Sequence, residues 1–239
     1  MDRSLQRKNN ERRLYILVAV AFPIIVLAGF ARTYYLKGLF GNPPLPGLLV
    51  HLHGIVMTSW VLLFVAQIWL VAGRRTRVHQ RLGVWGGVLA ALVVLVGVLT
   101  AISAAARGFP PIPPPLEFLV IPLGDMLIFA VLVATALHFR RRMDIHKRLM
   151  VLASLNLLAP AIARIPLKFI ETGGPVVFFG LTDLCVIACV VFDTIKNRRL
   201  HPAFAWGALL LIVSQPLRIM LGGTDVWVRF ASSLVGLVK

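Results

Sequence analysis

The sequence predicts an all-α membrane protein, a seven-helix transmembrane bundle with a cytoplasmic N-terminus and an external C-terminus. Three observations predict this class. Hydrophobic residues make up 59% of the 239 residues and charged residues only 14%, and the mean hydropathy is +0.86. A water-soluble domain needs more charged surface than this. The apolar residues fall into seven long runs, and most basic residues lie between alternate runs.

Each apolar run is close to the length of about 20 residues that a spanning helix needs. The predicted spans are Leu14–Arg32, Gly47–Ala72, Leu82–Ala106, Leu116–Phe139, Arg148–Phe169, Val176–Ile195 and Ala203–Met220. Proline and glycine clusters at 41–44, 109–115, 173–175 and 222–223 separate several of them. The first run is too long for the core of a secretory signal, and no small-residue cleavage site follows it. We therefore expect it to be a retained span.

The runs divide the chain into a basic N-terminal segment (1–13), a transmembrane domain (14–220) and a C-terminal tail (221–239). The tail contains apolar residues at helical spacing, and Thr224 or Asp225 precedes them as a helix cap. These apolar residues are Trp227, Phe230, Leu234 and Leu237. We expect a short helix that lies along the outer membrane interface.

Positive charge is concentrated on one side of the predicted topology. Of the 25 lysines and arginines, five lie in 1–13, four in 73–82, five in 139–148 and three in 195–203, a total of 17 on one side. The side that is richer in Lys and Arg faces the cytoplasm. The net charge of +16 therefore reflects the orientation of the protein in the membrane. We expect the Arg clusters to contact anionic lipid headgroups, and we expect no nucleic-acid partner.

A short motif recurs in two of the basic loops. Arg-Arg-x-x-(Val/Ile)-His-x-Arg-Leu occupies 74–82 and returns at 141–149, which is 67 residues later, and 198–201 holds a weaker echo. The chain after the first span therefore resembles three helical hairpins in one orientation, an arrangement that parallel repeats often produce in membrane proteins. Chance similarity between Arg-rich loops remains the alternative.

Ionisable residues within spanning helices are costly and mark functional sites by default. Six of them fall in the outer halves of five predicted helices, and we call this set the polar layer. Its members are His51, His53, Asp125, Arg164, Asp183 and Arg218. An aspartate side chain that lies about 12 Å deep is too short to reach the interface. Asp125 and Asp183 therefore need either a proton or a positively charged partner. Arg164 and Arg218 are the available partners. Two interpretations stay open, namely structural ion pairs and an outward-facing pocket that binds a ligand.

Histidines near both faces suggest a metal or haem site. His53 and Met57 lie four residues apart, as do His146 and Met150, which places each pair on one helix face. His53 and Met57 are the candidate ligands of a metal ion. The candidate haem ligands are His53, His79, His138 and His146. The Arg clusters would hold haem propionates, whereas packing methionines and ordinary loop histidines are the alternative.

Several short motifs resemble an uncharacterised family of bacterial multi-pass membrane proteins. They are His51-Leu52-His53-Gly54, His79-Gln80-Arg81-Leu82-Gly83, His146-Lys147-Arg148-Leu149-Met150 with Arg164 downstream, and Asp225-Val226-Trp227. The resemblance implies a bacterial cytoplasmic (inner) membrane but no activity. The histidines are also similar, more loosely, to those of the b-type haem cytochromes that move electrons across membranes. That similarity implies haem b, although only one predicted helix carries histidines near the outer face.

The sequence leaves two hypotheses for function. The first is a non-enzymatic binding, transport or assembly subunit, whose polar layer holds a small polar ligand or is covered by a partner protein in a membrane complex. The second is a haem-binding electron-transfer protein. We favour the first because it requires fewer ligands that the sequence does not show.

Overall fold

The structure is a computed structural model that describes residues 3–110 and 113–238, with side chains from residue 13 onward. Residues 1–2 of the predicted N-terminal segment, 111–112 of the predicted proline-rich break and 239 of the predicted tail lie outside this range. The described chain is all-helical, with 82% helix and no strands. Its elements are α1 (Arg3–Phe30), the π-helix η1 (Ala31–Tyr35), α2 (Leu48–Ala72), α3 (Thr76–Ala106), α4 (Pro115–Phe118), α5 (Val120–His138), α6 (Met143–Asn156), α7 (Ala159–Ile162), α8 (Lys168–Asn197), α9 (Pro202–Gly222) and α10 (Asp225–Gly236).

Seven helical segments of the described chain are long and apolar enough to cross a membrane, which confirms the predicted number of spans. Several boundaries differ from the prediction, among them the start of the third span, both ends of the fifth and the start of the sixth. The third span begins at Thr76 rather than Leu82, because the charged residues that end a hydrophobic run need not end a helix. The fifth span ends at Ile162 rather than Phe169. Pro166 disfavours helical geometry in the residue before it, and the next helix begins soon afterwards at Lys168.

The predicted break at 173–175 is a kink within α8. Gly174 has a φ of 56°, which is left-handed and which glycine adopts without a steric penalty. Pro175 follows it and removes a backbone donor at the same place. Two helical segments therefore meet at Gly174, where the backbone is not helical.

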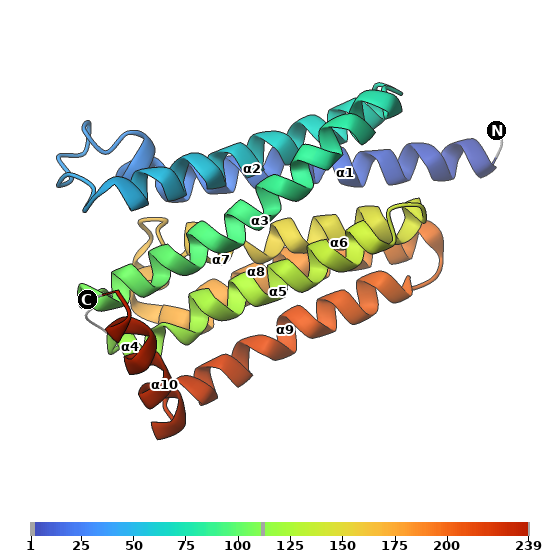
Figure 1. Ribbon diagram of the computed structural model, residues 1–239. Coiled ribbons are helices and arrows are strands. Elements are labelled where there is room, and N and C mark those ends of the chain that lie inside the picture. Colours follow the sequence, from blue (N-terminus) through green and yellow to red (C-terminus); the bar gives the residue numbers. More distant parts are fainter. Residues whose placement is uncertain (1–2, 111–112, 239) are drawn as a thin grey trace.

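The helices form a bundle whose hairpins turn at a common end (Figure 1). The α2–α3, α5–α6 and α8–α9 connections lie at the end that holds the N-terminus. We call it the basic end, because those connections carry the Arg clusters at 74–75, 140–142 and 198–199. The other end, which we call the opposite end, holds α4, α10 and the C-terminus (Figure 1). The span formed by α6 and α7 is the most enclosed, with 72% of its apolar window buried against 22–50% for the others.

Two of the basic-end turns place an arginine where glycine is usual. Arg74 has a φ of 59° and Arg198 a φ of 55°, both in the left-handed region. A non-glycine residue costs about 1–2 kcal/mol there, so these turns keep a charge at the end of the bundle at some cost in stability.

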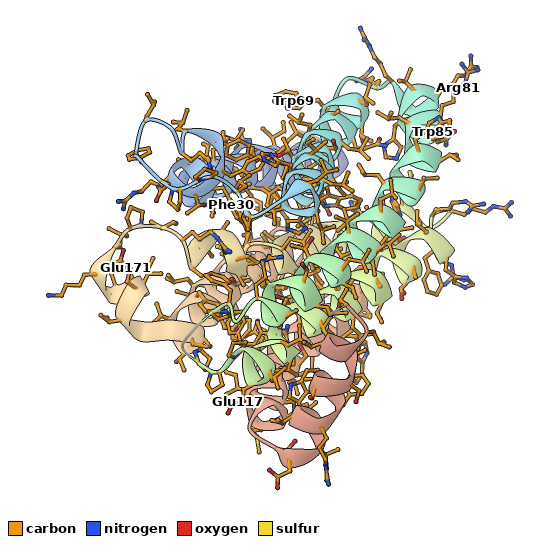
Figure 2. The ribbon with its side chains drawn as sticks, turned by 60° about the vertical axis from the view of Figure 1, so that its left-hand side comes forward. Phe30, Trp69, Arg81, Trp85, Glu117 and Glu171 are labelled. Carbon is orange, nitrogen blue, oxygen red and sulfur yellow. The ribbon has the colours of Figure 1, made fainter. Side chains whose placement is uncertain are left out.

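Exposed tryptophans accompany the basic end. Trp69, Trp85 and Trp206 are half or more exposed, and each lies within a few turns of a basic-end connection. Figure 2 shows Trp85 near Arg81, and Trp69 farther away at the same end. Amphipathic rings at this level are typical of a membrane–water interface.

The predicted C-terminal helix is present as α10. The Trp227 backbone N–H donates to Thr224 Oγ1 at 3.3 Å, so Thr224 rather than Asp225 caps it. Trp227 Nε1 also donates to the Leu116 carbonyl of α4 at 2.8 Å. The buried face consists of Trp227, Ala231 and Val235, and Phe230 points away from the bundle.

Candidate functional site

Arg218 organises a polar network inside the bundle. It lies on α9 and is 6% exposed. Its guanidinium donates to Asp125 Oδ1 on α5 at 2.5 Å and to the Ile121 carbonyl at 3.1 Å. It also donates to the carbonyl and hydroxyl of Ser214, at 3.1 and 3.3 Å. The guanidinium carbon lies 5.1 Å from the centroid of the Phe179 ring of α8. Every face of this charge is therefore occupied by protein.

A second carboxylate, that of Asp183 on α8, joins the same network. Gln215 Nε2 donates to Asp183 Oδ1 at 2.8 Å, and Gln215 is buried whereas Asp183 is half-buried. The charge of Arg218 also acts on Asp183. Asn156 of α6 donates to the Asp125 carbonyl at 2.8 Å and ties that helix to α5. We call the following residues the Arg218 network: Asp125, Asp183, Ser214, Gln215 and Arg218.

The Arg218 network contains one more acid than base. Asp125 and Asp183 oppose a single guanidinium, and Arg218 is the charged group that acts on both carboxylates within the described chain. An uncompensated charge in a low-dielectric interior is very costly, so such a group takes up a proton or a counter-ion. Among the described residues, two carboxylates therefore share one guanidinium.

A second buried ion pair lies near the basic end, and the sequence did not reveal it. Arg148 of α6 donates from Nε to Asp193 Oδ2 at 3.0 Å and from Nη2 to Asp193 Oδ1 at 2.8 Å. The two side chains are 3% and 1% exposed. This bidentate geometry is the strongest that an Arg–carboxylate pair adopts. A signal was present, because Asp193 lies inside the predicted span Val176–Ile195. Arg148 is both the first residue of the predicted span Arg148–Phe169 and the last residue of the basic loop 139–148, so the sequence gives it no definite depth.

The uncharged members of the Arg218 network and Asn156 were also missed. Ser214, Gln215 and Asn156 all lie inside predicted spans, but a search restricted to ionisable residues passes over them. Gln215 carried the clearer signal, since an amide within a spanning helix needs hydrogen-bond partners as a charge does.

The other residues of the polar layer do not join the Arg218 network. His51 is exposed, and its carbonyl accepts from the Tyr34 hydroxyl at 3.4 Å. Arg164 donates to the Pro160 carbonyl at 2.7 Å and lies 5.0 Å from the centroid of the Phe30 ring. Arg164 forms no ion pair within the described chain. Arg164 and Arg218 are the predicted partners of Asp125 and Asp183. Within the described chain, Arg218 forms an ion pair with Asp125, and Arg164 forms none with either aspartate.

His53 is half-buried on α2 and lies within electrostatic range of Arg164. Its Nδ1 is buried without a hydrogen-bond partner in the described structure, and so is Trp60 Nε1. Met57 is partly buried against the apolar core. No group of three or more His, Cys, Asp or Glu suited to a metal ion occurs among the described residues. Among the described residues, His53 therefore does not belong to a cluster of three such ligands.

The histidines at the basic end have three different environments. The rings of His79 and His146 lie edge-to-face with centroids 6.4 Å apart. His138 is exposed against the Phe139 ring. His201 Nε2 lies 3.1 Å from Asp144 Oδ2, and its Nδ1 accepts from a backbone N–H to cap α9. Of the four predicted haem ligands, the structure brings together only His79 and His146.

The chain stands apart from the proteins with which it was compared. No protein-family model, no curated protein and no solved structure matches it. Its seven apolar spans make it a multi-pass membrane protein, and any more specific statement depends on the chemistry of the groups described above.

Proposed function

We propose that the protein is a non-enzymatic membrane binding or transport protein that takes up a proton or a small cation at Asp183. The observation that supports this proposal is the charge imbalance of the Arg218 network, in which two carboxylates share one guanidinium. A membrane interior does not sustain the extra negative charge, so an exchangeable positive charge completes the site.

Asp183 is the better binding group of the two carboxylates. Asp125 is buried on all sides and directly bonded to Arg218. Asp183 is half-buried, and Gln215 provides the only hydrogen bond to its carboxylate within the described chain. Its second oxygen is therefore available to a proton or a cation, while Gln215 holds the first oxygen in place.

We further propose that the basic end faces the cytoplasm of a bacterium and that its Arg clusters meet anionic headgroups. The support is the positive-inside distribution of Lys and Arg, together with the exposed tryptophans at the same end. In this orientation the N-terminus is cytoplasmic, and α10 lies at the outer interface with its exposed apolar face toward lipid.

Proteoliposomes with an imposed potential test the proposal. Proton entry is followed with an internal pH dye, and sodium entry with a radioactive tracer. We expect flux of one of these cations in the wild type and its loss in Asp183→Asn. Glu171→Gln is the matched control, because Glu171 is an exposed acid on the same helix, and it should retain the flux.

Infrared difference spectra cover the case of binding without transport. A carboxylic-acid band that disappears when the pH or the sodium concentration is raised should be present in the wild type and absent in Asp183→Asn. A wild type that shows neither flux nor a cation-sensitive carboxyl band would overturn the proposal. A band that survives in Asp183→Asn and is lost in Asp125→Asn would move the site to Asp125.

A haem-binding electron-transfer protein is the second candidate function. One observation favours it, the approach of His79 to His146 at the basic end. It concerns a different site from Asp183, and the two proposals do not depend on each other.

A further inference from the structure

Arg164 is a fixed cation at the opposite end of the bundle, just after the fifth span ends at Ile162. Its Nη1 donates to the Pro160 carbonyl at 2.7 Å, and its guanidinium carbon lies 5.0 Å from the centroid of the Phe30 ring of α1. The side chain is exposed and forms no ion pair within the described chain. The two contacts hold the guanidinium and occupy one of its five N–H donors, so the other donors are available to a ligand.

The same part of the bundle also holds His53. Gly54, the next residue of α2, packs so closely on η1 that a Cβ at this position would overlap the ring of Tyr34. Tyr34 belongs to η1, which directly follows Phe30. The charge of Arg164 acts on His53. The junction of α1 and η1 therefore brings an imidazole of α2 and the guanidinium that follows α7 to one place.

The burial of one ring nitrogen assigns the proton of His53. Its Nδ1 is buried without a hydrogen-bond partner in the described structure. A buried N–H without an acceptor is rarer in proteins than a buried acceptor without a donor, so we assign the proton of the neutral ring to Nε2. The ring is half-buried, which leaves Nε2 on its other edge. The imidazole and the guanidinium thus both present donors, and two such donors suit an anion.

We propose that Arg164 and His53 bind the phosphate group of an anionic phospholipid in the leaflet at the opposite end. The planar fork of a guanidinium matches two phosphate oxygens, and an imidazole N–H suits a third. Arg164 follows the end of an apolar span, which is the level of the headgroups. Leu167 and Phe169 come shortly after it and are exposed, so acyl chains can lie against them. A free anion would make no use of these apolar side chains.

The experiment measures lipid binding to the purified full chain in detergent by native mass spectrometry. The probes are phosphatidylglycerol and a diacylglycerol with the same acyl chains, which lacks the phosphate. We expect the wild type to retain phosphatidylglycerol and not diacylglycerol. Arg164→Gln should lower the affinity of one phosphatidylglycerol site about 10–100-fold, because the charge-assisted hydrogen bonds to the phosphate are lost.

A second variant, His53→Phe, keeps an aromatic ring and removes both nitrogens, including the buried Nδ1. It should therefore fold as the wild type does and bind phosphatidylglycerol about tenfold more weakly. Arg229→Gln is the matched control, because Arg229 is an exposed arginine of α10 at the same end, and it should bind as the wild type does. Size-exclusion chromatography confirms that each variant is folded, and His53→Phe provides an answer if Arg164→Gln is not. Lipid bound by the Arg clusters of the basic end is a background common to all variants.

Three outcomes would overturn the proposal. One is retention of diacylglycerol as strong as that of phosphatidylglycerol. Another is a phosphatidylglycerol affinity that is unchanged in both Arg164→Gln and His53→Phe. The third is displacement of the lipid by an excess of inorganic phosphate, which would indicate a site for free anions. None of these measurements involves Asp183, so their result is independent of the cation uptake proposed there.

Discussion

The bundle contains two buried arginines in similar surroundings and with different charge balances. Arg148 donates two hydrogen bonds to Asp193, so that these two charges balance within the described chain. Arg218 meets Asp125 directly and also acts on Asp183, so its surroundings carry one negative charge in excess. Two carboxylates share the guanidinium in the second case and one meets it in the first, among the described residues. We propose that the first pair serves the fold and the second network serves binding.

Removing the acid from the balanced pair has the largest expected effect. Asp193→Asn removes the carboxylate that accepts from the buried Arg148 guanidinium, and breaking a buried ion pair costs about 3–5 kcal/mol in the free energy of unfolding. The measurement is unfolding in mixed detergent–SDS micelles, followed by circular dichroism. The double variant Arg148→Met/Asp193→Leu removes both charges and should recover most of the loss. A double variant as unstable as the single one would show that packing, and not charge, is what the pair provides.

The same type of change at the unbalanced network should cost less. Asp125→Asn removes the direct partner of Arg218, but Asp183 remains to neutralise it, so we expect a loss of about 1–3 kcal/mol in the free energy of unfolding. The network is then neutral, and cation uptake should disappear. A loss as large as that of Asp193→Asn, measured in the same micelles, would mean that Asp183 does not compensate Arg218.

The sequence predicted the spans well because each depends on a local property. A run of about 20 apolar residues must cross a bilayer as a helix, and all seven runs do form such helices. The ends of the spans were less predictable. Thr76 and the arginines after it extend α3, because a helix can continue past the membrane surface into a charged sequence. At Pro166 it was local stereochemistry, and not hydropathy, that ended the helical segment.

The sites required information that a single sequence does not contain. Depth along the helices predicts Arg164 and Arg218 as possible partners of the two aspartates, and the structure pairs Arg218 with Asp125. Depth does not say which face of a helix meets which neighbour, so Arg164 was an equally good candidate on that basis. The same limit applies to the histidines. The repeat marks His79 and His146 as equivalent, but only the packing of the hairpins shows that their rings meet.

The smallest expected effect on stability is that of Asp183→Asn, and it sharpens the comparison most. Asparagine keeps the oxygen that accepts from Gln215 and has the shape of a protonated aspartic acid. It also removes the excess negative charge, so the free energy of unfolding should change by at most about 1 kcal/mol, while cation uptake is lost. The same micelle titration as for Asp193→Asn, combined with proteoliposome flux, separates the two quantities. A loss of several kcal/mol in the free energy of unfolding would contradict this prediction. It would mean that the fold requires Asp183 in its charged form, as we expect for Asp193.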